Sequence, residues 1–326
     1  MRAARCTEHG RPEAITVEDL PEPEPGPGRV LVRVHAAAVN FPDVLIVADR
    51  YQASAPVPFT PGSEFAGVVT GLGEGASGPA VGTPVMGTVF TGAFAEHVVA
   101  RAADLRPVPD GLDMTSAAAF AVTYNTAFHA VRTIGDASPG EWVVVLGAAG
   151  GVGTATVDVA ARLGMRVIAV ASSPERLAVA AGRGAEAGID YAQEDLREGI
   201  RRITGGAGAD VVVDPVGGAH AEAALRGLRW GGRFVTVGYA DGEIPRIPLN
   251  LVLLKGVIVR GFQGPGIRTH LPEAVVDADR VLAGLVAEGM RPLVSQVYPL
   301  EEAGSALTAV ADRRTTGKVV LRMAPG

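Results

Sequence analysis

The middle of the chain, from about residue 141 to residue 261, repeats one pattern of apolar and mixed segments. Short, largely β-branched runs read as strands: WVVVLG, RVIAVAS, DVVVDPVG, RFVTVGY and VIVRGF. They alternate little between apolar and polar residues, which is typical of parallel strands buried on both faces. Segments such as PERLAVAAGRG and HAEAALRGL between them read as helices. The pattern therefore predicts an α/β fold with a doubly wound parallel sheet.

The flanking segments have a different pattern. Residues 1–115 are β-rich, with apolar runs broken by Gly and Pro clusters, and an apolar helical stretch follows up to residue 132. The last 65 residues predict an amphipathic helix, a strand (LVSQVYPL), a second helix and a final strand (KVVLRM). We expect residues 1–120 and 263–326 to form one discontinuous β-rich domain, and residues 121–262 to form the α/β domain.

A glycine-rich turn, AAGGVG at 148–153, follows the first strand of the α/β domain and opens a helix of small residues. It is a version of the GxGxxG motif in the strand–turn–helix context that dinucleotide binding requires. The glycines permit a tight turn, a close approach of backbone to a pyrophosphate, and close packing of helix against strand. The helix start offers backbone N–H groups and a positive dipole end to phosphate. The predicted phosphate-binding residues are Gly150, Gly151, Val152 and Gly153.

The tip of the next strand selects the dinucleotide. An NAD site has Asp or Glu there to bind the ribose 2′-OH. This chain has Ser172 and Ser173 at that point, with Arg176 shortly after. Small hydroxyls and an arginine suit a 2′-phosphate, so we predict NADPH as the cofactor. Ser173 also suits the N-cap of the following helix, and the two roles are compatible.

Composition narrows the class. The chain has 326 residues, is 48% apolar and carries a net charge of −6, with no basic stripe for nucleic acid. It has no apolar run long enough for a membrane span, and its N-terminus lacks a signal core, so we expect a cytoplasmic protein. A single cysteine, Cys6, excludes an internal disulfide and a zinc site built on two thiolates. The six histidines show no ligand spacing, and neither Lys255 nor Lys318 has a convincing partner.

Seven motifs in the same order carry a family resemblance. They are AAAVNFPDVLIVADRY, PFTPGSEFAGVV, GAFAEHVV, TYNTAFHAV, LGAAGGVG, VVVDPVGG and RRTTGKVVL. The chain resembles the zinc-independent quinone oxidoreductase branch of the medium-chain dehydrogenase/reductases over essentially its whole length. This implies a Rossmann domain and a GroES-like domain. The zinc-dependent branch has a ligating cysteine where this chain has Ala37–Val39, and a histidine where it has Ser63, so we expect no metal site.

The resemblance also implies roles for single residues. Asn40 corresponds to an asparagine beside the nicotinamide ribose and ring; the alternative is that it only caps the helix that begins near Pro42. Tyr51 corresponds to a tyrosine at the entrance of the substrate pocket that can donate a proton. The alternative is that its ring only lines the pocket and has no proton role. Thr126 corresponds to a threonine that contacts the nicotinamide, and the alternative is that it is an ordinary helix residue. Further cofactor residues implied are Tyr191 and Arg313 for the 2′-phosphate, and Gly238, Tyr239 and Phe262 along the dinucleotide.

The leading interpretation is an NADPH-dependent oxidoreductase that transfers hydride to a quinone or another conjugated carbonyl without zinc. One alternative is a reductase of C=C bonds in enones or enoyl thioesters, and another is a non-enzymatic NADPH-binding protein. The missing ligands argue against a zinc alcohol dehydrogenase. We also expect a homodimer, because the apolar strand VIVRGF would otherwise leave an exposed sheet edge.

Overall fold

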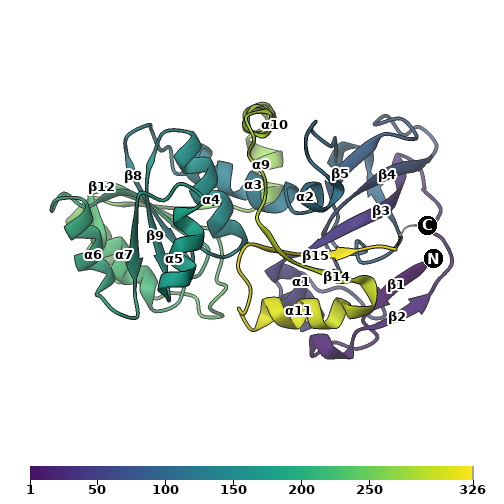
Figure 1. Cartoon of the computed structure of the whole chain (residues 1–326), viewed down its shortest axis with the longest axis horizontal. Helices are drawn as coiled ribbons and strands as arrows, with labels where there is room; N and C mark the ends of the chain where they lie inside the picture. The colour runs from purple at the N-terminus through teal and green to yellow at the C-terminus, as the bar shows by residue number, and fades with distance from the viewer. Residues whose placement is uncertain (325–326) are drawn as a thin grey trace. The chain divides into compact units, whose positions relative to one another are not determined.

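The computed structural model describes residues 1–324 and divides into two compact units (Figure 1). The first unit comprises Met1–Val122 and Arg291–Gly326, and the second comprises Thr123–Met290. The chain therefore returns to the first unit later than residue 263. Helices α9 (Gly264–His270) and α10 (Pro272–Ala287) belong to the second unit, where they contact each other and α10 contacts the helical turn His129–Ile134.

The second unit is built on a six-stranded parallel sheet. Its order is β10-β9-β8-β11-β12-β13, so the chain starts in the middle and winds outward in both directions. The strands are β8 (Trp142–Leu146), β9 (Arg166–Ala171), β10 (Ala187–Asp190), β11 (Ala209–Asp214), β12 (Leu228–Thr236) and β13 (Ile258–Gly261). The five strands predicted from apolar runs are confirmed. The sixth, β10, was not predicted, because its four residues AGID include a glycine and a charge.

Both faces of this sheet are covered by helices. Val144 and Leu146 of β8 belong to one apolar cluster, and their neighbours Val143 and Val145 belong to another. The first cluster includes residues of α6 (Leu196–Ile203), α7 (His220–Gly227) and α8 (Leu249–Lys255). The second includes residues of α4 (Gly151–Arg162) and α5 (Pro174–Ala181). This is the doubly wound arrangement that the uninterrupted apolar strands predict (Figure 1).

The apolar stretch after residue 115 forms three short helical pieces rather than one long helix. They are α2 (Met114–Ala118), α3 (Ala121–Phe128) and the π-helical turn η3 (His129–Ile134). The last two are contiguous, and the division between the two units falls inside α3, after Val122.

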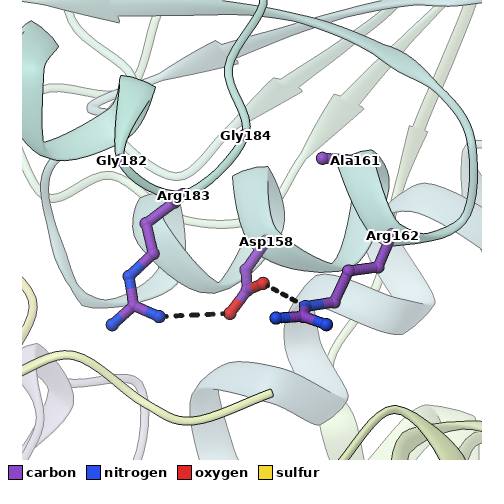
Figure 2. A pocket seen from close by; sticks show the side chains of 6 residues that line it. All are labelled: Asp158, Ala161, Arg162, Gly182, Arg183 and Gly184. Atoms are coloured by element: carbon purple, nitrogen blue, oxygen red, sulfur yellow. Dashed lines mark hydrogen bonds and ion pairs between the residues drawn. The ribbon is translucent and has the colours of Figure 1, made fainter. Parts of the chain in front are cut away.

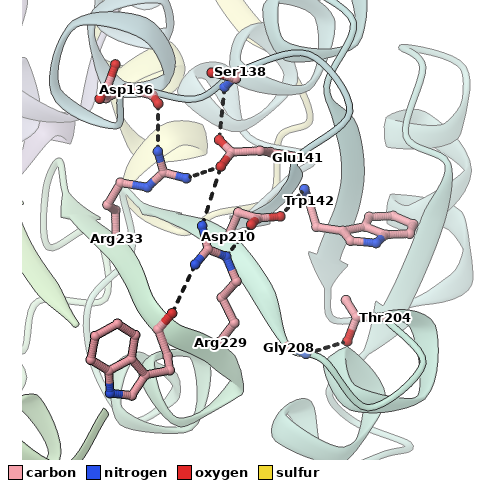
Figure 3. A network of polar contacts seen from close by, with 10 residues as sticks. Asp136, Ser138, Glu141, Trp142, Thr204, Gly208, Asp210, Arg229 and Arg233 are labelled. Carbon is pink, nitrogen blue, oxygen red and sulfur yellow. Dashed lines mark hydrogen bonds and ion pairs between the residues drawn. The ribbon is translucent and has the colours of Figure 1, made fainter. Parts of the chain in front are cut away.

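Charged residues tie the strands together at the amino-terminal ends of β8 and β11. Arg233 donates to Glu141 at 2.7 Å and to the Asp136 carbonyl at 2.6 Å. Asp210 pairs with Arg229 and accepts from the Trp142 N–H at 2.7 Å. Figure 3 shows these contacts as one connected network. It lies at the opposite ends of the strands from the glycine-rich turn, so we assign it to stability.

The first unit is a mainly antiparallel sheet with short helices. A seven-stranded sheet follows the order β14-β15-β3-β4-β5-β7 with β6 also paired to β3, and β1 pairs with β2. The strands are β1 (Arg2–Arg5), β2 (Thr16–Asp19), β3 (Arg29–Val39), β4 (Glu64–Leu72), β5 (Pro84–Thr88), β6 (His97–Arg101), β7 (Leu105–Pro107), β14 (Val294–Pro299) and β15 (Lys318–Arg322). The helices are α1 (Phe41–Val47), α2 and α11 (Ala303–Ala311), together with the first residues of α3. Single 3-10 turns lie at Pro12–Ala14, Ala102–Asp104 and Leu300–Glu302.

The C-terminal strand confirms that the end of the chain returns to the N-terminal sheet. β15 pairs antiparallel with β3, with Val319 opposite Val39. Lys318 and Asn40 therefore lie next to each other at the end of this pairing. Within residues 1–324, no helix has the length and apolar character needed to cross a membrane.

Candidate active site

The glycine-rich turn has little space for side chains. A Cβ at Gly153 would lie 2.0 Å from the Gly147 carbonyl oxygen, so α4 packs directly on the end of β8 only because residue 153 is glycine. Gly147 takes φ +60°, and its carbonyl accepts from the Gly150 N–H at 2.9 Å. Gly147 thus makes the tight turn. Gly147 was not among the predicted site residues, because it precedes the six-residue motif.

Helix α4 begins directly after this turn with open backbone donors. Gly150 is its N-cap, and the first intrahelical bond is from the Thr154 N–H to the Gly150 carbonyl at 2.8 Å. The N–H groups of the preceding first-turn residues have no acceptor one turn back in the helix. A twelve-residue helix whose start is free of side-chain bulk is suited to a phosphate or pyrophosphate.

The tip of β9 carries the predicted 2′-phosphate residues. Ser173 is the N-cap of α5, and its hydroxyl accepts from the Arg176 N–H at 3.4 Å. A hydrogen bond with Ser173 also lowers the pKa of the Glu175 carboxyl, which is fully exposed. Ser172 is exposed and Arg176 is half-buried. The N-cap role is therefore present, and it keeps the serines and Arg176 within one helical turn.

Tyr191 joins this group from the end of β10. Its N–H donates to the Ala171 carbonyl at 3.1 Å, next to Ser172. Its ring pairs with that of His220, with centroids 4.2 Å apart. His220 begins α7 and was not singled out from the sequence, because no spacing links it to Tyr191. The two rings meet because strand ends of a parallel sheet converge at one edge.

The loop after β11 is held by a buried carboxylate. Asp214 accepts from the N–H groups of Val216 and Gly217, both at 2.8 Å, and burial raises the pKa of Asp214. Gly217 has φ +71°, and a Cβ there would lie 2.9 Å from the Tyr239 ring. The predicted residue Tyr239 therefore packs over this loop.

The other predicted residues of the second unit are dispersed. Gly238 follows β12, and its N–H lies 3.4 Å from the Asp214 carbonyl oxygen. Phe262 follows β13 and contacts the His129 ring edge-on, with centroids 6.3 Å apart. Thr126 is half-buried on α3. Gly238 thus lies beside the Asp214 loop, whereas Phe262 and Thr126 lie on other segments.

Asn40 of the first unit lies in a buried polar cluster. Its side-chain Nδ2 donates to Glu64 Oε2 at 3.0 Å, and its Oδ1 accepts from Lys318 Nζ at 2.5 Å. Lys318 also contacts Glu64 Oε2 at 3.1 Å and the Val39 carbonyl at 3.3 Å. The exposed fractions of Asn40, Glu64 and Lys318 are 6%, 0% and 4%. The prediction that Lys318 lacks a partner is therefore wrong. The sequence could not show the contact, because Lys318 and Asn40 are 278 positions apart and are brought together by strand pairing.

Asn40 is also the N-cap of α1, as the alternative interpretation held. Its N–H donates to Asp43 Oδ2 at 2.8 Å. Burial raises the pKa of Asp43 to about 6, although Ser63, Asn40 and Lys318 oppose the shift. Asp43 thus supports the start of α1.

Tyr51 and Arg313 lie elsewhere in the first unit. Tyr51 follows α1, is half-buried against the apolar core, and its hydroxyl lies 3.4 Å from Gln52 Nε2. Arg313 is exposed and takes φ +55° in the turn between α11 and β15.

A separate hollow of about 300 Å³ lies beside α4 and the end of α5 (Figure 2). Asp158 sits between Arg162 and Arg183, with contacts of 2.7 and 3.4 Å. Asp158 also accepts from the Tyr124 hydroxyl at 3.0 Å, and burial raises the pKa of that phenol. None of the predicted site residues lines this hollow. The Asp158 carboxylate binds α3, α4 and the end of α5 together.

Metal ligation has no candidate set in the described residues. Across residues 1–324, no three His, Cys, Asp or Glu side chains gather as metal ligands would. Ala37–Val39, where the zinc-dependent branch has a ligating cysteine, form part of β3. Ser63, where that branch has a histidine, hydrogen-bonds the Asp43 carboxyl and lowers its pKa.

Comparison with known proteins agrees with these features. A model described as "Zinc-binding dehydrogenase" matches residues 151–278, and one described as "Alcohol dehydrogenase GroES-like domain" matches residues 26–110. The "Quinone oxidoreductase-like protein 2" of Rattus norvegicus is 36% identical over 329 residues, covering 99% of this chain and 92% of the relative.

Solved structures give the same result. The quinone oxidoreductase of Thermus thermophilus, also solved in complex with NADPH, is 36% identical with a TM-score of 0.87, covering 99% of this chain and 100% of that one. The Escherichia coli quinone oxidoreductase complexed with NADPH is 26% identical with a TM-score of 0.91, at the same coverages. The fold is therefore a Rossmann-type unit with a GroES-like unit. The chain belongs to the quinone oxidoreductase branch of the medium-chain dehydrogenase/reductase family.

Proposed function

We propose that this protein is an NADPH-dependent oxidoreductase that reduces a quinone or another conjugated carbonyl compound, without zinc. The observation that carries the proposal is the tip of β9, where Ser172, Ser173 and Arg176 stand in place of an acidic residue. The NADPH complexes of the related Thermus and Escherichia enzymes support the same cofactor.

The residues present fit this cofactor. Gly147 and Gly153 allow the tight turn and the close packing of α4 on β8, and no side chain at Gly150 covers the start of the helix. The start of α4 can therefore present its N–H groups to the pyrophosphate. Ser172, Ser173, Arg176 and Tyr191 would hold the 2′-phosphate. NADPH, when bound, supplies the hydride. The protein's part is to hold its acceptor and donor groups in fixed positions and to exclude water.

The remaining site residues complete the proposal. We assign Asn40 to the nicotinamide end of the cofactor and Tyr51 to the substrate. Thr126, Gly238, Tyr239 and Phe262 would line the dinucleotide, and Arg313 would add to the 2′-phosphate contacts. Zinc independence is supported by the side chains themselves, since alanines, Val39 and Ser63 offer no strong zinc ligand.

Fluorescence titration with the two reduced cofactors tests the assignment. We expect NADPH to bind at least tenfold more tightly than NADH, which is about 1.4 kcal/mol and within reach of one charge-assisted phosphate contact. Equal affinities would refute the 2′-phosphate site.

The substitution Tyr51→Phe separates quinone reduction from reduction of activated C=C bonds. An enone or enoyl thioester needs a proton at the α-carbon after hydride reaches the β-carbon, and a positioned phenol raises that rate by roughly 10²–10⁴-fold. A reduced quinone is a stabilised phenolate that takes its proton from water. We therefore expect Tyr51→Phe to lower kcat on enoyl substrates while quinone reduction stays within a few-fold, measured with both substrates on one preparation. Unchanged rates with both substrates would show that Tyr51 only lines the substrate pocket and donates no proton.

A further inference from the structure

Tyr191 and His220 form a ring pair at the carboxyl edge of the parallel sheet. The ring centroids are 4.2 Å apart, and the ring planes are tilted by 38°. Tyr191 follows β10, and its N–H donates to the Ala171 carbonyl, next to the exposed Ser172. His220 is the first residue of α7. An imidazole therefore lies directly beside the residues assigned to the 2′-phosphate, and the proposed function gives it no role.

The polar atoms of both rings are available to a ligand. Within residues 1–324, neither the Tyr191 hydroxyl nor a ring nitrogen of His220 has a hydrogen-bond partner. Tyr191 is 37% exposed, and His220 is half-buried. The buried His129 differs, because its Nδ1 lies 2.9 Å from the Thr133 hydroxyl. His220 therefore keeps its whole hydrogen-bonding capacity, which is two donors when the ring is protonated.

Acidic groups reach His220 from the neighbouring strand ends. Asp214, at the end of β11, is 0% exposed, and the charge of His220 opposes the rise in the Asp214 pKa that burial causes. Asp241, after β12, lies with its carboxylate 2.4 Å from a Cβ placed on the glycine two residues before His220. Glu222, on α7 itself, is paired with an arginine one turn further on at 2.8 Å. The phenol of Tyr191 completes the titratable groups around the imidazole.

A 2′-phosphate carries more charge than Arg176 alone neutralises. Like other phosphate monoesters, it has a charge of about −1.5 to −2 at pH 7. Of the four residues of the second unit assigned to it, only Arg176 is a cation, and the adjacent Glu175 is an anion. Histidine is the side chain whose charge changes between about pH 5 and pH 8. A protonated imidazole beside Tyr191 would supply the second positive charge.

We propose that His220, in its protonated form, is a further residue that selects NADPH over NADH, by adding a positive charge to the 2′-phosphate site beside Tyr191. This proposal rests on the NADPH function proposed above. An imidazolium attracts the phosphate, whereas a neutral imidazole contributes no charge. The contribution of His220 is therefore present at acidic pH and is lost as the pH rises and the ring loses its proton.

The phosphate also titrates, and its titration acts in the opposite direction. Its second pKa is about 6, so acid removes charge from the ligand and weakens every contact of the site. The contribution of His220 is therefore measured as the ratio of native to His220→Phe affinity at each pH. Both proteins bind the same ligand, so the phosphate titration cancels. The phenylalanine introduced by His220→Phe keeps an aromatic ring against Tyr191 and removes both nitrogens.

Calorimetric titration with NADP⁺ and NAD⁺ at about pH 6 and about pH 8.5 tests the proposal. At pH 6 we expect the native protein to bind NADP⁺ roughly three- to tenfold more tightly than His220→Phe does. At pH 8.5 the two should agree within about twofold, and NAD⁺ affinity should be the same for both proteins at either pH. His270→Phe, at the exposed end of α9, is the matched control and should bind as the native protein does.

Two results would overturn the proposal. Equal NADP⁺ affinities of native protein and His220→Phe at both pH values would show that His220 makes no contribution. A loss of the same size at both pH values, or one shared by NAD⁺, would show that the imidazole acts through packing and not through charge. His220→Gln, which also removes the charge and keeps a polar side chain, decides in the same way should His220→Phe not fold.

His220→Lys tests the charge in the opposite sense. An ammonium stays protonated at pH 8.5, so we expect this variant to bind NADP⁺ roughly three- to tenfold more tightly than the native protein at that pH. An affinity no greater than native at pH 8.5 would contradict the proposal. The proposed function fails separately: a native protein that binds NADP⁺ no more tightly than NAD⁺ overturns both proposals. A native protein that prefers NADP⁺, with a native-to-variant ratio independent of pH, overturns the role of His220 alone.

Discussion

We propose that single residues at the tip of β9 decide which cofactor this protein takes. Ser173 caps α5, and that cap keeps its hydroxyl within one turn of Arg176. The sequence predicted both roles because each depends on local spacing. Lys318 and His220 were not predicted, because their partners Asn40 and Tyr191 are distant in the chain and are brought close only by strand pairing.

Arg176→Ala tests the residue that separates NADPH from NADH. A guanidinium that contacts the 2′-phosphate contributes nothing to a cofactor without that group. We expect the variant to bind NADPH about tenfold more weakly, while its NADH affinity stays within about twofold, as measured by fluorescence titration. Arg280→Ala, on the exposed side of α10, is the control. Parallel losses for both cofactors would show that Arg176 supports the fold of the loop instead.

At the scale of elements, strands that contain a β-branched apolar run were predictable, whereas a strand of small and charged residues and the breaks in a helical stretch were not. Strands β8, β9, β11, β12 and β13 are apolar runs that need no tertiary information. Strand β10 has only Ile189 fully buried, and the helical stretch after residue 115 divides into α2, α3 and η3. The return of the chain to the first unit was predicted too early, because the amphipathic pattern of α10 does not say which unit it packs against.

Gly153→Ala tests the contact between α4 and β8. A methyl group 2.0 Å from the Gly147 carbonyl oxygen has no room, because that neighbour is backbone. The helix start must move, so we expect a loss of several kcal/mol in unfolding free energy or no folded protein. Gly284→Ala, in the exposed interior of α10 with open space around it, should raise stability by about 0.5–1 kcal/mol. Denaturant melts measure the stability of the variant, and fluorescence titrations measure its NADPH affinity. Native values of both for Gly153→Ala would contradict the packing assigned to this turn.

At the scale of the whole molecule, the second unit would leave apolar residues of β13 and α8 exposed to water if the protein were a monomer. Strand β13 ends the six-stranded sheet, and all four of its residues are exposed. Helix α8 precedes it with Leu249, Leu253 and Leu254 at 81%, 81% and 69% exposure. The Trp230 ring lies against the turn at Gly256 that links them. Proteins usually pair or cover an exposed apolar edge strand, so we propose that a second copy pairs its β13 with this one.

Light scattering tests the dimer. We expect the native protein to have the mass of two chains at micromolar concentration, and Val259→Lys on β13 to shift it towards one chain. Val276→Lys on α10 is matched in type and is also on an exposed position. A native mass of a single chain would refute the dimer, as would equal effects of the two lysine substitutions.

In the reaction that we propose, hydride passes from NADPH to a quinone without zinc. The most direct measurement is the rate of NADPH oxidation by phenanthrenequinone with protein that has been treated with a chelator and assayed for metal. We expect turnover by protein that holds no stoichiometric zinc, and we expect the chelator to leave it unchanged. The value of kcat/KM with NADPH should be at least about tenfold greater than with NADH. Turnover that disappears with the chelator and returns with zinc, or that proceeds equally with NADH, would contradict it.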